Sequence, residues 1–363
     1  MTGASKGGGI LQKTLIVARI KYEKLALYLI LIILVLFTAG ADKIPDYDSY
    51  QSIYVGDARS SDFLFDNICD VCFKLGLSYN NFRLLCISTS LIIIYSVATV
   101  FLNTKQTAAF LLMFTVYPLL IDAIQIRNFI AMSFVTLGFK VLLCSTKHCK
   151  LKYVLLVLFA TCIHKISFAY LPISLFYSSI RTKRKKFFFY SIIILLLVWL
   201  FFSLRFVLSY IELVPINMLR HKLQYYFTHH RMRYGYLLIF GMHILMINIF
   251  FILQRMLKKQ CSCCVLPKYI NKMLTFTLYI NLYMLLFFPF ALIDMTAIRF
   301  FRVLIPVNYI TIIATMRYLP FFKKLLLSVA VIIFILVVFY TDIYGASPEG
   351  NIVNMYFYSN WIF

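Results

Sequence analysis

Long apolar runs are the feature that most limits the folds open to this chain. Of its 363 residues, 62% are hydrophobic and 13% are charged, whereas soluble domains carry about 25% charged residues. A helix needs about 20 apolar residues to cross a bilayer. The sequence therefore predicts an all-α, polytopic transmembrane helix bundle with about eleven spans: 25–41, 84–102, 107–122, 129–144, 152–164, 166–180, 187–209, 234–254, 273–293, 300–318 and 325–341.

Three of these spans are unusual. The fifth and sixth are short, and we interpret them as a helical hairpin that turns at His164 and Lys165. The first run resembles a secretory signal peptide, with Ala39 and Ala41 where a peptidase would cleave. Because the run is about long enough to span a bilayer, an uncleaved first helix is favoured.

Lys and Arg define the orientation of the bundle. With the N-terminus inside, the inner segments hold 22 of the 36 Lys and Arg residues and the outer segments hold 12. Cytoplasmic loops carry the excess of these residues, so topology explains the formal charge of +23 without a nucleic-acid partner. The predicted organisation is a cytoplasmic tail (1–24), an integral membrane domain (25–341) with external loops 42–83 and 210–233, and an external tail (342–363).

Six of the 13 acidic residues lie in the external stretch 44–70. Pro45 is suited to the first position of a helix, with Asp46 and Asp48 in the first turn, where the helix dipole favours acids. We expect these two acids to hydrogen-bond sugar hydroxyls or to pair with an arginine. Three others, Asp62, Asp66 and Asp70, are interpreted as solvated.

The same short helix carries an aromatic face. Tyr47, Tyr50 and Tyr54 have helical spacing, and the face is suited to stacking on sugar rings, lying on the membrane surface or packing over the bundle. Cys69 and Cys72 follow in this segment and could form a disulfide if the outer side is oxidising.

Arg127 is the first candidate for chemistry at membrane depth. It stands between the third and fourth spans, near Asp122, Gln125 and Asn128. Ionisable groups in membrane segments are costly and mark functional sites, although helix-end cations also extend to the interface. The polar neighbours favour a functional cluster over a single anchoring charge.

Three more candidates lie at outer ends of spans. His164 is a structural residue or a base, since neutral imidazole can take a proton from a hydroxyl near pH 7. Arg299 and Arg302 are three residues apart on one helical face. They could hold phosphate oxygens through their guanidinium groups, or pair with nearby Asp294.

The external loop 210–233 runs against the positive-inside trend. Its charge would bind anionic lipid head groups or attract a phosphorylated, lipid-linked substrate. Its candidate substrate-binding residues are Arg220, Arg231 and Arg233. The chain has no glycine-rich phosphate loop, nucleophile-elbow serine or metal-ligand spacing, so we expect neither a metal nor a cofactor.

The order of these features resembles the EpsG branch of the Wzy-type polysaccharide polymerases, which make capsular, exopolysaccharide or O-antigen chains. The matching stretches are "YDSYQSIY" (47–54), "GLSYNNFRLL" (76–85), "IRNFIAMSF" (126–134) and "HKISFAYLP" (164–172). The chain differs at Asn128, where family members often have Gln.

The resemblance implies a metal-independent glycosyltransferase in the bacterial cytoplasmic membrane. Its substrate would be an oligosaccharide repeat on a polyprenyl diphosphate, and its partners would be membrane lipids, a chain-length regulator and a flippase. Arg127 and one of Arg299 or Arg302 would hold the diphosphate, and His164 would be the base. The alternatives are a flippase for a lipid-linked oligosaccharide and a membrane O-acyltransferase.

Overall fold

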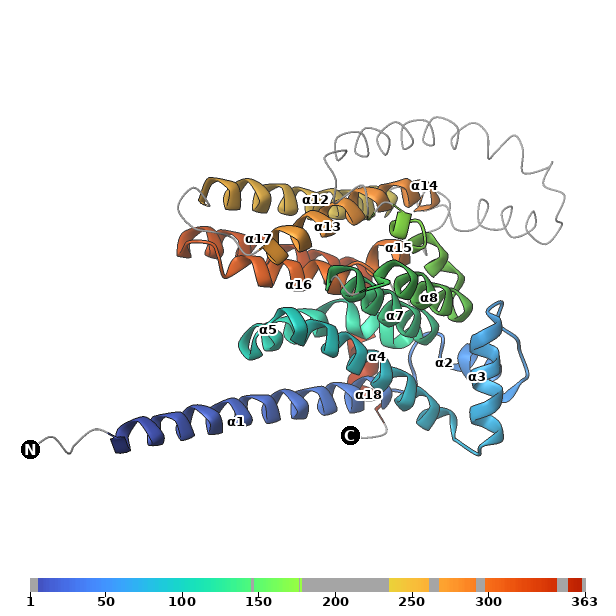
Figure 1. The fold of residues 1–363 in the computed structure, drawn as a ribbon. Helices are drawn as coiled ribbons and strands as arrows, with labels where there is room; N and C mark the ends of the chain where they lie inside the picture. Colours follow the sequence, from blue (N-terminus) through green and yellow to red (C-terminus); the bar gives the residue numbers. More distant parts are fainter. Residues whose placement is uncertain are drawn as a thin grey trace, which may run out of the picture.

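The computed structural model describes residues 6–144, 147–175, 177, 235–260, 268–291, 298–344 and 352–360. These residues form helices and no strand, and most of the helices run side by side in one bundle (Figure 1). Eight helical segments are long and apolar enough to cross a membrane. The described part of the chain is therefore a polytopic helical membrane protein.

The elements follow one another in a simple order. The N-terminal half contains α1 (Lys6–Ala39), α2 (Tyr47–Val55), α3 (Phe63–Lys74), α4 (Tyr79–Phe101), α5 (Thr104–Phe114), η1 (Thr115–Leu119), α6 (Leu120–Ile124), α7 (Ile126–Leu143), α8 (Cys149–Ile163) and the 3-10 helix η2 (Lys165–Tyr170). The C-terminal half contains α12 (Gly235–Gln260), α13 (Lys268–Met284), α14 (Phe288–Ala291), α15 (Ile298–Arg302), α16 (Ile305–Met316), α17 (Phe321–Phe339) and α18 (Ile352–Tyr358).

Eight of the eleven predicted spans correspond to the eight membrane-length segments. The predicted span 152–164 corresponds to α8, which has 15 residues and is too short to count among these eight segments. The chain turns after α8 at His164, as the hairpin interpretation predicted, and continues into η2. Only residues 176 and 178–180 of the predicted span 166–180, but all of span 187–209, lie outside the described residues. At the N-terminus, α1 already begins at Lys6, inside the segment assigned to a tail.

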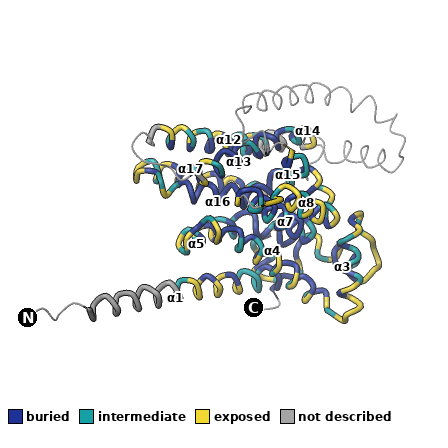
Figure 2. Tube along the Cα trace, viewed as in Figure 1, coloured by how far each residue is buried: buried dark blue, intermediate teal, exposed yellow. Residues whose placement is uncertain are grey.

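Burial separates helices at the centre of the bundle from helices at its edge. Every residue of α16 from Ile305 to Thr315 is buried. Helix α17 instead includes exposed residues (Figure 2), and its large apolar side chains Ile332 and Leu336 are among those that stay exposed. Because lipid tails are as apolar as these side chains, an exposed apolar face on an outer helix suits contact with the bilayer. The centre of the bundle thus positions the functional groups, and the edge faces lipid.

The C-terminal helix α18 packs against the end of the first span. The Asn360 side chain donates to the Phe37 carbonyl (2.8 Å), and the Tyr356 hydroxyl donates to the Leu120 carbonyl (2.7 Å). The buried Arg83 of α4 donates to the carbonyls of Ala41 and, at 3.5 Å, Thr38. These contacts give the end of α1 fixed neighbours at the same end of the bundle as the polar site.

Helices α2 and α3 form a small layer over this end. The aromatic face of α2 points inward, because Tyr50 and Tyr54 are buried and the Tyr54 ring stacks on Phe82 with centroids 4.8 Å apart. Of the three expectations for this face, packing over the bundle is the one that the structure shows. Helix α2 begins at Tyr47, two residues after Pro45, and Asp46 is its N-cap residue.

Candidate active site

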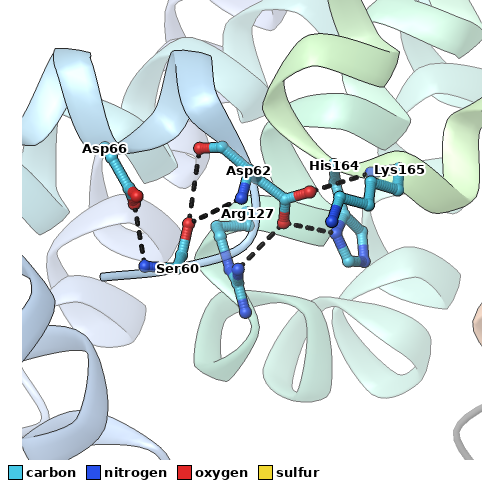
Figure 3. A network of polar contacts seen from close by, with 6 residues as sticks. All are labelled: Ser60, Asp62, Asp66, Arg127, His164 and Lys165. Atoms are coloured by element: carbon cyan, nitrogen blue, oxygen red, sulfur yellow. Dashed lines mark hydrogen bonds and ion pairs between the residues drawn. The ribbon is translucent and has the colours of Figure 1, made fainter. Parts of the chain in front are cut away.

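Asp62 joins two residues that the sequence singled out. Its Oδ2 atom accepts a hydrogen bond from Arg127 Nη1 at 2.8 Å and lies 3.2 Å from His164 Nδ1. Its Oδ1 atom accepts the backbone N–H of Lys165 at 3.2 Å. Figure 3 shows the carboxylate between the arginine and the imidazole. One buried acid therefore connects the start of α3 to the ends of α7 and α8.

The local sequence explains how Asp62 becomes available. It is the N-cap residue of α3, a position where Asp commonly accepts a backbone N–H, yet its side chain makes no capping hydrogen bond. The preceding turn is held by Ser60, whose backbone N–H donates to Asp66 (3.2 Å) and whose hydroxyl accepts the backbone N–H of Asp62 (3.1 Å). The carboxylate is thus turned away from its own helix and into the site.

The two partners of Asp62 stand at helix ends. Arg127 is in the first turn of α7, where the helix dipole disfavours a cation, and the nearby carboxylate compensates for this. The Arg127 guanidinium also lies over the Tyr50 ring, 5.4 Å from its centroid. His164 occupies the break between α8 and η2, with an extended backbone.

The protonation states follow from burial and charge. Burial, the strongest influence on Asp62, would raise the pKa of its carboxyl, but contacts with His164 and Arg127 hold that pKa below its ordinary value. Burial lowers the pKa of His164 and outweighs the opposing effect of Asp62. At neutral pH the acid is ionised and the imidazole is neutral, so Nδ1–H donates to Asp62 and Nε2 is left as an acceptor.

Three nitrogen atoms of the predicted catalytic residues are buried without a hydrogen-bond partner among the described residues. They are Nε2 of His164, Nε of Arg127 and Nε of Arg299. Leaving a buried polar group unpaired costs about 1–3 kcal/mol, and more if the group is charged. Such groups are tolerated at binding and catalytic sites. Other buried groups, such as the Thr136 and Tyr309 hydroxyls, share this property, so it makes the three nitrogens candidate contacts for a polar ligand.

Arg302 has a different environment from Arg299. Its Nε lies 2.7 Å from Asp122 Oδ1, with both side chains almost completely buried, and its Nη2 donates to Gln125. Asn128 donates to the same Asp122 oxygen at 3.5 Å. The polar cluster predicted around Arg127 therefore exists, but its acid and amides surround Arg302, because Arg127 points to Asp62.

Arg299 is the arginine of this group without an acidic partner in the described part of the chain. No ion pair there includes it, although Asp46, Tyr50, Arg127 and Arg302 are near enough to act on its charge. The predicted alternative partner, Asp294, lies outside the described residues. Arg299 also acts on the charge of His164, so the arginine and the base belong to one cluster.

The acids of the stretch 44–70 have surroundings that differ from the prediction. Asp62 is 3% exposed and not solvated, so that interpretation was wrong: two cationic or polar partners draw it inward. Asp46 and Asp48 are exposed, and neither forms an ion pair with Arg127 within the described ranges. A weak signal for Asp62 was present in the sequence, an acid directly before an amphipathic helix, but nothing there indicated its partners.

Three further predictions concern the cysteines, the arginines of loop 210–233 and metal binding. Cys69 and Cys72 are buried free thiols. The loop residues Arg220, Arg231 and Arg233 lie outside the described residues. Within the part of the chain that the structure covers, no group of three or more His, Cys, Asp or Glu side chains could hold a metal ion.

Comparison with known proteins gives one match. The model of the EpsG family matches residues 25–359. No curated protein matches the chain, and no solved structure does. The matched region includes α2 and α3, the polar cluster and the C-terminal helix α18.

Proposed function

We propose, from the premise that this chain belongs to the EpsG family of Wzy-type polysaccharide polymerase-like proteins, that it joins lipid-linked oligosaccharide repeats into a surface polysaccharide. The proposed substrate is an oligosaccharide on a polyprenyl diphosphate, and the proposed site faces the outside of a bacterial cytoplasmic membrane. The observation that supports this most directly is the set of unpartnered buried nitrogens on His164, Arg127 and Arg299.

The arginine nitrogens and the histidine nitrogen suit different parts of a glycosyl transfer, namely the leaving diphosphate and the attacking hydroxyl. Arg127 and Arg299 offer N–H donors and positive charge, which match the oxygens of a diphosphate. His164 offers the lone pair of Nε2, which matches the proton of a sugar hydroxyl. Arg302 is already engaged by Asp122, so Arg299 is the better of the two arginines for the phosphate role.

The reaction is a displacement at the anomeric carbon of the growing chain. The hydroxyl oxygen of the next lipid-linked repeat forms the new glycosidic bond and passes its proton to Nε2 of His164. The bond from the anomeric carbon to the diphosphate oxygen breaks, and the lipid diphosphate leaves with the electron pair. Arg127 and Arg299 stabilise the charge that develops on that oxygen, while Asp62 stabilises the imidazolium that forms.

The test compares variants in cells that depend on this protein for their polysaccharide. Changing His164, Arg127 or Arg299 to Ala should abolish polymer and leave single lipid-linked repeats at the outer face. His148→Asn is a matched control, because this exposed His has a left-handed backbone that Asn tolerates. Polymer of normal length in a normally expressed His164→Ala variant would contradict the assignment.

The location of the accumulated material separates the alternatives. Lipid-linked repeats trapped at the inner face would indicate a flippase. Full-length polymer that lacks acyl groups would indicate an O-acyltransferase. Single repeats at the outer face are the result expected only of a polymerase.

A further inference from the structure

A cavity lies far from the polar cluster around Asp62 and Arg302. It has a volume of about 460 Å³, is open to the surface and is lined by residues of α5, α16 and α17, together with Arg317 just after α16. Arg302 stands at one end of the Ile298–Met316 segment and Arg317 follows the other, so the two sites are about 22 Å apart at 1.5 Å per residue. The cavity therefore belongs to the opposite end of the bundle, which the distribution of Lys and Arg assigns to the cytoplasm.

One part of the cavity lining is cationic, and the rest is mostly aliphatic. Three cations from two parts of the chain line it together with the amide of Gln106: Lys105 of α5, and Arg317 and Lys324 on either side of the turn between α16 and α17. The remaining lining is mostly aliphatic and includes Leu112 and Ile332, which are 69% and 55% exposed. No described carboxylate lines the cavity or forms an ion pair with any of the three cations.

We infer that this cavity binds one anionic phospholipid, with its phosphate among Lys105, Arg317 and Lys324 and an acyl chain along the aliphatic wall. Cations at a membrane surface favour anionic head groups, and basic pockets between spans on the cytoplasmic side are suited to them. A cavity of this size lies within the usual range for small-ligand sites. The inference does not depend on the proposed polymerase activity.

General positive-inside charge is the competing explanation, and the convergence of the cations argues against it. Topology requires only that Lys and Arg lie in cytoplasmic segments. It does not require three of them to border one apolar cavity. Lys323, the neighbour of Lys324, does not line the cavity. It therefore serves as a control, a lysine beside the site whose charge does not belong to it.

Binding can be measured on the purified full-length protein by native mass spectrometry. The probes are dioleoylphosphatidylglycerol and the zwitterionic dioleoylphosphatidylcholine. Wild-type protein should retain one phosphatidylglycerol in preference to phosphatidylcholine. The combined K105Q, R317Q and K324Q substitutions should weaken this binding about 100-fold, since each cation near the head group contributes roughly fivefold. Lys323→Gln should bind like wild type.

A second variant tests the apolar part of the site without changing charge. Ala109 lines the cavity and is exposed, so Ala109→Phe should fill the volume and displace the lipid while the protein keeps its thermal unfolding midpoint. Equal binding of the two lipids by wild-type protein would overturn the inference. So would equal losses in Lys323→Gln and the triple variant, or displacement of phosphatidylglycerol by an equal concentration of undecaprenyl phosphate.

Discussion

Replacing Asp62 with Asn tests whether this acid positions and supports the base. The substitution keeps the size of the side chain and an acceptor for the Lys165 N–H, but it removes the charge beside His164. At 3.2 Å and an effective dielectric constant of about 20, a carboxylate stabilises an imidazolium by about 5 kcal/mol. Arg127 shares the same oxygen, and the Asn dipole still accepts from Nδ1–H. We therefore expect about half of this stabilisation to be lost, which is roughly a 100-fold fall in kcat.

The pH dependence gives a result that a purely structural role would not. Asp62 raises the pKa of His164, against the lowering effect of burial. Without the carboxylate the pKa of the imidazole falls further, so the base stays neutral at lower pH. The acidic limb of the profile of kcat/KM against pH should therefore move to lower pH in Asp62→Asn. Simple misfolding would lower the activity equally at every pH and leave the limb in place.

The assay needs no knowledge of the sugar. Lipid-linked repeats extracted from cells that lack the protein are given to purified protein in proteoliposomes, and the polymer ladder is quantified over time and pH. Asp70→Asn is the control, because Asp70 pairs with Arg59 at the surface and has no contact with the base. A rate for Asp62→Asn within threefold of the control, with an unchanged acidic limb, would refute the argument.

Three further changes have outcomes that follow from packing and charge. Arg302→Ala should lower the free energy of unfolding by about 3–5 kcal/mol, because it leaves the Asp122 carboxylate buried and unpaired; normal expression with lost polymer would instead indicate a catalytic role. Gly138→Ala should lower the free energy of unfolding by about 1–3 kcal/mol, since the new Cβ would lie 2.9 Å from the buried Tyr153 ring. An unchanged melting midpoint in detergent would contradict this. Tyr356→Phe removes the hydrogen bond to the Leu120 carbonyl and should cost about 1 kcal/mol, whereas an unaltered melting midpoint would show that α18 is not held by it.

The membrane-helical class and most span positions could be predicted because they depend on local composition. A span needs only a long apolar run, and eight of the predicted runs are membrane-length helices. The positions of breaks within the helices were harder to predict from the sequence. The third span is divided near Pro118, where Tyr117 leaves the helical conformation, and the predicted run 107–122 gave no position for that break.

The site residues were predictable one by one, but their pairing was not. Arg127, His164 and Arg299 attract attention because charge and imidazole are rare at membrane depth. Their partners depend on which helix ends meet in three dimensions. Gln125 and Asn128 flank Arg127 in sequence yet bind around Arg302, whereas the acid that Arg127 contacts is Asp62, 65 residues away.

The position of Asp62 gives the acidic stretch 44–70 a role in the candidate site that its composition alone did not indicate. The other five acids are exposed, paired with Arg59 at the surface or bonded within the turn before α3, and none of them forms an ion pair with Arg127 or His164. Asp62 is different, because it contacts Arg127 and His164 directly, while Tyr50 from the same layer lies over the arginine. Folding of α2 and α3 onto the bundle therefore completes the site itself. Mutation of this layer should thus separate into two classes: changes at Asp62 and Tyr50 should impair transfer of any repeat, and changes at exposed acids such as Asp48 should leave it intact.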